Sequence, residues 1–228
     1  MNVATRKPLA DCRLYTFVDF AYLDGRDPRE LARQLCEGGS DLVQLRAKGQ
    51  SAAEIRKWAE LLLPIVESFG AWFVVNDHAE IAQSIGAPLC HLGQEDFFAS
   101  GLQCVENLFP GTDDGPSLPG VGLSSHAPDQ ADRAVKSGAA YVAVGPVFAT
   151  PTKRGRTPVT LEYVRWARDH LNCPWFAIGG INLQTLPDVL RAGAQRVCVV
   201  SAILRSTTIA VTCREFRRRL DDGGSPSH

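Results

Sequence analysis

Residues 51–77 read SAAEIRKWAELLLPIVESFGAWFVVND and contain one complete structural unit. Ser51, with Glu54 three residues later, forms a capping box that predicts a helix to about residue 69. Gly70 accepts the left-handed conformation that commonly ends a helix. The apolar run Trp72–Val75 is typical of a buried parallel strand, and polar residues follow where that strand ends.

The same unit of helix, glycine and strand recurs along the chain. Gly-Ala pairs begin at positions 70, 86, 138 and 193, each after a helical stretch and before a strand. Eight short apolar runs predict strands at Leu14–Val18, Leu42–Leu45, Trp72–Val75, Leu89–Leu92, Val121–Leu123, Tyr141–Val144, Trp175–Ile178 and Arg196–Val200. Each run is apolar on both faces, as expected for a parallel sheet that is covered by helices.

Further helices have recognisable first residues. Asp27 precedes a proline at the first helical position, and Thr160 can cap a helix over residues 161–170. Asn182 can cap a helix to about Ala192, although Pro187 near its start can shift the true beginning.

Strict alternation of eight strands with helices leaves two main α/β architectures. A doubly wound sheet usually carries G-x-G-x-x-G after its first strand, whereas residues 19–22 here read DFAY. We therefore expect a single (β/α)8 TIM barrel over residues 1–220. Residues 107–119 predict a surface loop, and residues 221–228 predict a disordered polar tail.

Composition restricts the class of partner and the compartment. The 228 residues carry a formal net charge of -1, which gives no bulk attraction to nucleic acid or to an anionic membrane. There is no apolar run of about 18 residues and no signal peptide over residues 1–11. Seven cysteines without a C-x-x-C pair indicate buried free thiols in a reducing cytoplasm. The oligomeric state is left open, and a homo-oligomer is compatible with this composition.

The loops after the carboxyl ends of barrel strands form the active site of such proteins, so polar residues at those ends are informative. Gln44, Arg46 and Lys48 alternate along the second strand and would share one face. This face should point into the barrel mouth, where two cations require an anion. The alternative is a frayed strand end with solvated charges.

Carboxylates follow the third and fourth strands. Asp77 follows Asn76 at the end of one strand, and Asp96 closes the stretch HLGQED after the next. Two carboxylates from neighbouring strand ends can hold Mg²⁺, which usually takes one or two carboxylates plus phosphate oxygens. The alternative is that both aspartates cap the following helices. Ser124, after the fifth strand, offers a hydroxyl to a ligand.

The last three strand ends carry phosphate-binding signals. Residues 145–156 form a long loop with Thr150, Thr152 and Lys153, and this loop is either a solvated segment or a lid. Gly180 and Ser201 mark the next two strand ends, where backbone N–H groups and a short helix starting near Ser201 can bind phosphate. His91 and His126 are predicted near the barrel mouth, and the sequence shows no nucleophile that either could activate. We therefore expect both histidines to orient other groups or to belong to the core.

Taken together, these stretches resemble the thiamine phosphate synthase family from the first strand to the last. They are QLRAK (44–48), VND (75–77), HLGQED (91–96), GLSSH (122–126), GPVFATPTK (145–153), AIGGI (177–181) and VVSAI (199–203). The resemblance implies a transferase that joins 4-amino-2-methyl-5-hydroxymethylpyrimidine diphosphate to 4-methyl-5-(2-phosphoethyl)thiazole. The products are thiamine phosphate and pyrophosphate, and Mg²⁺ is the implied cofactor.

The resemblance also implies a role for each matching residue. The residues implied to bind the pyrimidine diphosphate are Gln44, Arg46, Lys48, Asn76, Ser124 and Lys153. Within that set, the candidates for a catalytic role are Arg46, Ser124 and Lys153. The implied Mg²⁺ ligands are Asp77 and Asp96. The residues implied to bind the thiazole phosphate are Thr150, Thr152, Gly180, Val200 and Ser201.

The chain departs from the family pattern at Ala47, where Glu is common, and at His78, where Arg is common. Neither position is an implied ligand. The rival interpretations are a thiazole tautomerase-like enzyme, a sugar-phosphate epimerase or isomerase, and a non-catalytic paralogue that binds thiamine precursors. The HLGQED and TPTK stretches favour the synthase, because the tautomerase lacks the full metal and diphosphate set.

Overall fold

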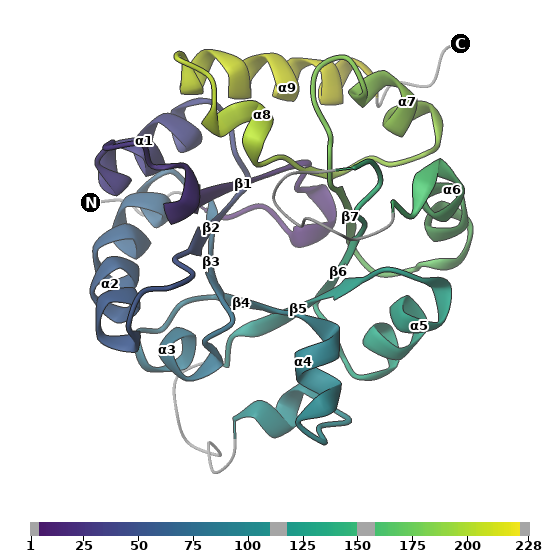
Figure 1. The fold of residues 1–228 in the computed structure, drawn as a ribbon, viewed down its shortest axis with the longest axis horizontal. Helices are drawn as coiled ribbons and strands as arrows, with labels where there is room; N and C mark the ends of the chain where they lie inside the picture. Colours follow the sequence, from purple (N-terminus) through teal and green to yellow (C-terminus); the bar gives the residue numbers. More distant parts are fainter. Residues whose placement is uncertain (1–4, 110–117, 150–157, 224–228) are drawn as a thin grey trace.

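Eight parallel strands form a closed ring at the centre of the molecule, and helices surround them (Figure 1). The computed structural model describes residues 5–109, 118–149 and 158–223. Each strand pairs with the next in chain order, and β8 pairs with β1. The strands are β1 Leu14–Asp19, β2 Leu42–Arg46, β3 Trp72–Asn76, β4 Leu89–Leu92, β5 Gly120–Ser125, β6 Tyr141–Val144, β7 Trp175–Ile178 and β8 Val197–Cys198. The predicted (β/α)8 barrel is confirmed.

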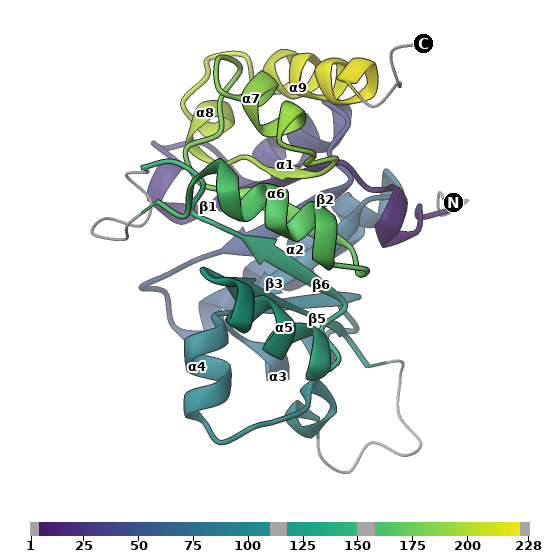
Figure 2. The same ribbon diagram turned by 90° about the vertical axis from the view of Figure 1, so that its right-hand side faces the viewer.

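Helices cover the outer surface of the strands (Figure 2). They are α1 Pro28–Glu37, α2 Ala52–Ser68, α3 Ala79–Ser84, α4 Gln94–Ala99, α5 Pro128–Lys136, α6 Thr160–His170, α7 Leu186–Arg191, α8 Ser201–Leu204 and α9 Ile209–Gly223. The capping box before α2 is present, since the Ser51 side chain accepts a hydrogen bond from Glu54 N and the Glu54 side chain accepts one from Ser51 N. The described ranges also contain three short 3-10 helices: η1 Leu9–Asp11, η2 Phe20–Tyr22 and η3 Val105–Leu108.

Some boundaries differ from the sequence predictions. The helix expected after Asn182 begins at Leu186, because the Asn182 Oδ1 accepts hydrogen bonds from Gln184 N at 2.8 Å and Thr185 N at 3.0 Å and so makes a turn first. Helix α9 continues to Gly223, past residue 221, where a disordered tail was expected to begin. In the predicted loop 107–119, residues 110–117 lie outside the described residues.

Aromatic side chains fill the interior of the barrel. The ring of Tyr15 lies 5.4 Å from that of Phe176 and 5.8 Å from that of Tyr141, edge to face in both pairs. Gly122 on β5 provides the space for Tyr141, because a Cβ there would lie 2.1 Å from the tyrosine ring. Large side chains therefore pack the barrel as a core, and it is not an open pore.

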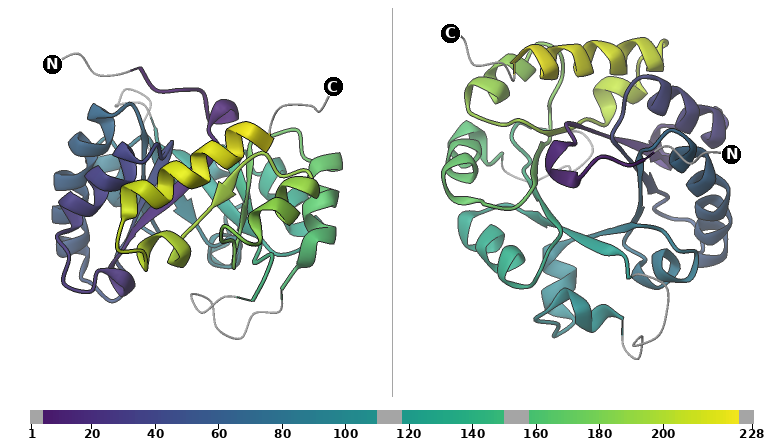
Figure 3. Two further views of the ribbon diagram at one scale, coloured as in Figure 1. Left: turned by 90° about the horizontal axis from the view of Figure 1, so that it is seen from above. Right: turned by 180° about the vertical axis from the view of Figure 1, so that it is seen from behind.

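The amino-terminal segment crosses the end of the barrel at which the strands begin (Figure 3). Buried Asp41 fixes this segment, since its carboxylate accepts hydrogen bonds from Arg13 N at 2.7 Å and Lys7 Nζ at 3.1 Å. The same carboxylate accepts a hydrogen bond from Arg217 Nη1 of α9 at 2.6 Å. The amino-terminal segment therefore covers this end of the barrel and is held there by ion pairs to Asp41.

All seven cysteines lie in the described ranges and are free thiols, five of them buried, as the sequence predicts. Burial raises the pKa of Cys36 and of Cys213 to about 12, so neither thiol is reactive near neutral pH. None of the helices in the described ranges has the length and apolar character needed to cross a membrane.

Candidate functional site

A pocket of about 610 Å³ lies at the end of the barrel where the strands finish, the end that faces the viewer in Figure 1. Residues at or just after the ends of β4 to β8 line it, among them His91, Ser124, His126, Gly145, Gly180, Val200 and Ser201. The parallel sheet brings these residues together, although they are spread over 110 positions of sequence, because all strand ends meet at one rim.

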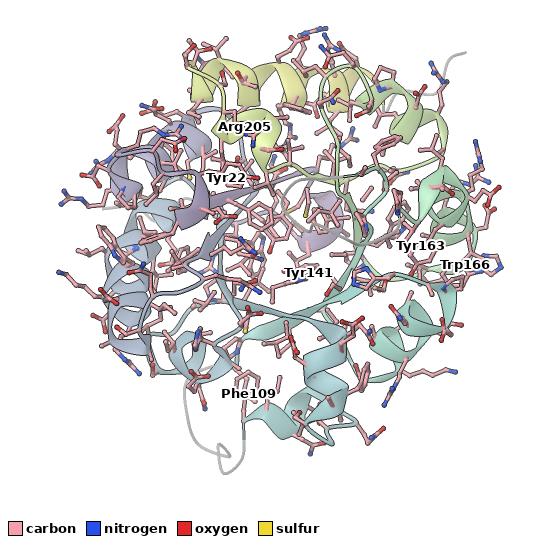
Figure 4. The ribbon with its side chains drawn as sticks, in the orientation of Figure 1. Tyr22, Phe109, Tyr141, Tyr163, Trp166 and Arg205 are labelled. Carbon is pink, nitrogen blue, oxygen red and sulfur yellow. The ribbon has the colours of Figure 1, made fainter. Side chains whose placement is uncertain are left out.

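Two neighbouring serines at the end of β5 have different surroundings. Ser124 is buried and lines the pocket. Ser125 points to the outer side, where its hydroxyl lies 2.7 Å from the Tyr163 hydroxyl of α6. Tyr163 in turn donates a hydrogen bond to Ala127 O at 2.7 Å, and Figure 4 shows its place on α6. Strand alternation therefore presents Ser124, and not Ser125, to a ligand.

The residues after β6 are hydrogen-bonded to the end of β7. Val147 N donates to Ile178 O at 2.8 Å, and Phe148 N donates to Gly179 O at 3.0 Å. Gly180 has a φ of 67°, and a Cβ at this position would lie 2.6 Å from the Cβ of Phe148. Glycine is therefore required where these two loops form one wall of the pocket. Three residues implied to bind ligand in the next stretch lie outside the described residues: Thr150, Thr152 and Lys153.

The end of β8 has the short helix that the sequence predicts. Val200 is the N-cap of α8, and Ser201 is its first residue. Both residues line the pocket beside Gly180. Unpaired backbone N–H groups at a helix start and after a glycine pair are suited to bind phosphate oxygens.

The three residues predicted to share one face of β2, Gln44, Arg46 and Lys48, lie at different depths, from the barrel interior to the rim. Gln44 is buried, and its Nε2 donates a hydrogen bond to the Tyr15 hydroxyl. Arg46 Nη1 pairs with the carboxylate of Asp19 at 2.8 Å, and that carboxylate is 1% exposed. Lys48 is exposed at the rim. Arg46 is thus fixed in position by a buried partner on the neighbouring strand.

Asp19 was not among the residues predicted for the site. Strand pairing places this residue directly opposite Arg46. The sequence did contain one indication of this residue, namely a carboxylate at the end of the first strand. Its Oδ1 also accepts a hydrogen bond from Ala21 N at 3.0 Å, so Asp19 both starts the short helix η2 and holds Arg46.

Of the two predicted metal-ligand carboxylates, Asp77 directly follows β3, and Asp96 lies in the helix that follows β4. Asp77 has a φ of 65°, and its N–H donates to His91 O on β4 at 2.9 Å. Its carboxylate lies 3.6 Å from Lys48 Nζ. Asp96 lies in the first turn of α4, and a Cβ on Gly93 would be 2.9 Å from its Oδ2. In the described ranges no group of three or more His, Cys, Asp or Glu side chains is arranged to hold a metal by itself.

A buried hydrogen-bonded chain links the pocket to the interior. The hydroxyl of Tyr15 lies 2.9 Å from that of Tyr141, and the latter lies 3.2 Å from Nδ1 of His91. Burial raises the pKa of both tyrosines well above the ordinary value of 10.0. His91 is therefore held from below by a neutral tyrosine, and its own role toward a ligand stays a prediction. His126 Nδ1 bonds to Gly145 O in the same pocket.

The fold and this pocket are typical of a (β/α)8 barrel that binds phosphorylated small molecules. Backbone N–H groups of glycine and serine follow β7 and β8, and cationic side chains lie at the end of β2. Comparison with known proteins makes this more specific. The family described as thiamine monophosphate synthase matches residues 14–203. The chain belongs to this family.

Individual relatives agree with this assignment. The thiamine-phosphate synthase of Thermus thermophilus is 42% identical over 80% of this chain and 84% of its own. That of Gloeobacter violaceus is 42% identical over 85% of this chain, which spans 54% of the longer relative. The structure of thiamine phosphate pyrophosphorylase from Pyrococcus furiosus superposes with a TM-score of 0.82 at 25% identity, covering 96% of this chain and 100% of that one.

Proposed function

We propose that this protein is a transferase that joins the pyrimidine diphosphate to the thiazole phosphate at the barrel mouth and releases pyrophosphate. The family match over residues 14–203 carries the proposal, since it spans all eight strands and every residue that lines the pocket. Relatives in which the match covers most of both chains bear the name thiamine-phosphate synthase.

The pyrimidine diphosphate is assigned to the β2, β3 and β5 side of the mouth. Arg46 and Lys48 neutralise its diphosphate, and Asn76 and Ser124 hydrogen-bond the ligand. Gln44 lies deeper, where its amide contacts both Tyr15 and the ligand above. Lys153 completes this set from the loop after β6. The 2.8 Å contact between Arg46 and Asp19 supports the assignment, because it holds the guanidinium ready before a ligand arrives.

The donor set at β3 and β4 fits Mg²⁺. Asp77 after β3 and Asp96 in the helix after β4 offer hard carboxylate oxygens, and the described residues form no closed cage around them. Mg²⁺ typically takes one or two carboxylates and completes its shell with water and substrate phosphates. When bound, the ion neutralises negative charge on the diphosphate oxygens.

The thiazole phosphate is assigned to the opposite side of the pocket. Gly180, Val200 and Ser201 supply backbone N–H groups and a hydroxyl there, and Thr150 and Thr152 add hydroxyls. Of the described residues assigned to the pyrimidine diphosphate, Ser124 also lines the pocket that contains Gly180, Val200 and Ser201, so it lies where the two substrates would meet.

The chemistry needs charge stabilisation and alignment. The bond between the methylene carbon and the diphosphate oxygen breaks, and its electron pair leaves with pyrophosphate. The amino group of the pyrimidine supplies electron density to the methylene carbon, and the thiazole nitrogen donates its lone pair to form the new C–N bond. No strong general base is needed, which agrees with a mouth rich in cations and hydrogen-bond donors.

A direct assay tests the proposal. The protein is mixed with both substrates and Mg²⁺, and thiamine phosphate and pyrophosphate are measured. Equal amounts of the two products are expected, with loss of turnover when a chelator removes the metal. Binding of the substrates without turnover would instead identify a precursor-binding paralogue, and conversion of a thiazole isomer alone would identify a tautomerase.

A further inference from the structure

A second hollow adjoins the pocket on the side of α8. It has a volume of about 780 Å³ and shares Gly180, Ile181 and Ser201 with the pocket. It extends from this shared wall to Arg205, the residue that follows α8. The hollow therefore borders the wall to which the thiazole phosphate is assigned.

Arg205 is distinguished by its charge. Of the described residues that line either hollow, it alone carries a permanent positive charge. Within the described ranges it has no ion pair with a carboxylate, and its guanidinium lies 5.6 Å from the centre of the Tyr22 ring. An aromatic face holds a guanidinium by stacking and leaves its N–H edges available to an anion.

The loop after β1 supports this pair. Arg26 donates hydrogen bonds to Leu23 O at 2.9 Å and to Leu204 O of α8 at 2.7 Å. It also donates to Tyr22 O. The loop that carries Tyr22 is thereby joined to the end of the helix that carries Arg205, and Figure 4 shows the two side chains next to each other at the rim.

We propose that Arg205, held on the ring of Tyr22, is a further phosphate-binding residue of this enzyme and selects the phosphorylated thiazole. The inference rests on the proposed function. The other described groups assigned to that phosphate, at Gly180, Val200 and Ser201, are uncharged. A phosphate monoester carries close to two negative charges at neutral pH, so a cation at the open side of its site supplies the missing counter-charge.

Steady-state kinetics with each substrate varied in turn test the proposal. Arg205→Ala should raise KM for the thiazole phosphate about tenfold, the loss of one partly exposed charge-assisted hydrogen bond, and leave KM for the pyrimidine diphosphate unchanged. Arg205→Lys should recover part of the loss. The matched control is Arg214→Ala on exposed α9, which removes the same charge far from the mouth and should leave both KM values unchanged.

Calorimetric titration gives a readout that does not depend on turnover. Arg205→Ala should weaken binding of the thiazole phosphate about tenfold and leave binding of the unphosphorylated thiazole alcohol unchanged. If Arg205→Ala weakens the binding of both ligands equally, or of neither, the proposed role of Arg205 is wrong. The proposed function still holds in that case, provided that the wild-type enzyme makes thiamine phosphate. A wild-type protein that makes no thiamine phosphate overturns the proposed function and this inference together.

Tyr22 acts here as a positioning residue. Tyr22→Leu should raise KM for the thiazole phosphate about threefold, in line with the modest strength of an exposed cation–π contact. Tyr22→Phe, which keeps the ring, should raise this KM less than Tyr22→Leu does. In the Arg205→Ala background Tyr22→Leu should add nothing, and additive effects would contradict the proposed link between the two residues.

Discussion

Ser124 and Ser125 are neighbours whose roles can be separated by experiment. Ser124→Ala should lower kcat/KM on the order of 10- to 100-fold, because it removes a hydrogen bond to the ligand, and should leave stability almost unchanged. Ser125→Ala should instead lower the free energy of unfolding by about 1 kcal/mol, since it removes the buried contact to Tyr163. Urea unfolding and steady-state kinetics of both variants distinguish the two roles. Loss of activity in Ser125→Ala together with loss of stability in Ser124→Ala would contradict the proposed site.

Arg46 and its partner Asp19 allow a test that separates binding from folding. Arg46→Ala should slow turnover about 10- to 100-fold and also cost about 3 kcal/mol of stability, because it leaves the buried Asp19 carboxylate unpaired. The double variant Asp19→Asn/Arg46→Ala should regain most of the stability and none of the turnover. Recovery of turnover in the double variant would show that Arg46 serves only the fold.

At the scale of single residues the sequence predicts to within one or two positions where the strands end, and it does not predict which side chains pair across them. Ser124, named in advance from its match to the family stretch GLSSH, lines the pocket, whereas the neighbouring Ser125 contacts Tyr163. The pairing of Arg46 with Asp19, and the chain from Gln44 through Tyr15 to Tyr141, depends on which strands are neighbours and on their register. A local sequence pattern contains no information about which strands are neighbours or about their register. The roles assigned to the site residues stay predictions.

The loops after β6 and β7 act as one element, and Gly180 is where they meet. Gly180→Ala would place a Cβ 2.6 Å from Phe148 Cβ at a φ of 67°. It should cost about 3 kcal/mol in stability and raise KM for the thiazole phosphate. Gly86→Ala is the matched control, because its φ of 71° is similar and no heavy atom lies within 4 Å of the added Cβ. This control should cost about 1 kcal/mol and leave the kinetics unchanged.

At the scale of elements, the eight strands and most of the helices between them could be predicted, whereas α9 and some boundaries could not. The first residue of α2 follows from its capping box, which is local. The start of α7 does not, because the side chain of Asn182 forms a turn before Thr185 and helix begins only at Leu186. The end of β8 at Cys198 depends on pairing with β1 and β7.

For the whole molecule, the packing of helices α1 and α9 against each other outside the barrel determines a response to alkaline pH, because each helix buries a thiol there. Burial raises the pKa of the Cys36 and Cys213 thiols from 9.0 to about 12. The folded state therefore keeps protons that the unfolded chain releases near pH 9. Their contribution to stability is complete below about pH 9 and is lost as the pH rises toward 12.

Urea unfolding between pH 7 and pH 11 checks this dependence. The free energy of unfolding should decline above pH 9, with a slope of about 1.4 kcal/mol per pH unit for each such thiol. The slope in Cys36→Ala should be smaller. A constant stability up to pH 11 would contradict the burial of these thiols.

The barrel itself, the family and the class of enzyme are predicted from the sequence and confirmed by the fold and the comparisons. The amino-terminal segment across the opposite end was not predicted, because its anchors Asp41 and Arg217 are 176 residues apart in sequence.

A crystal structure with Mg²⁺, pyrophosphate and thiamine phosphate would show the metal ion and both products in place at once. We expect pyrophosphate on Arg46 and Lys48, a metal ion on Asp77 and Asp96, and the phosphate of thiamine phosphate at Gly180 and Ser201. Ligands bound elsewhere, or a metal ion that touches neither aspartate, would contradict the proposed site.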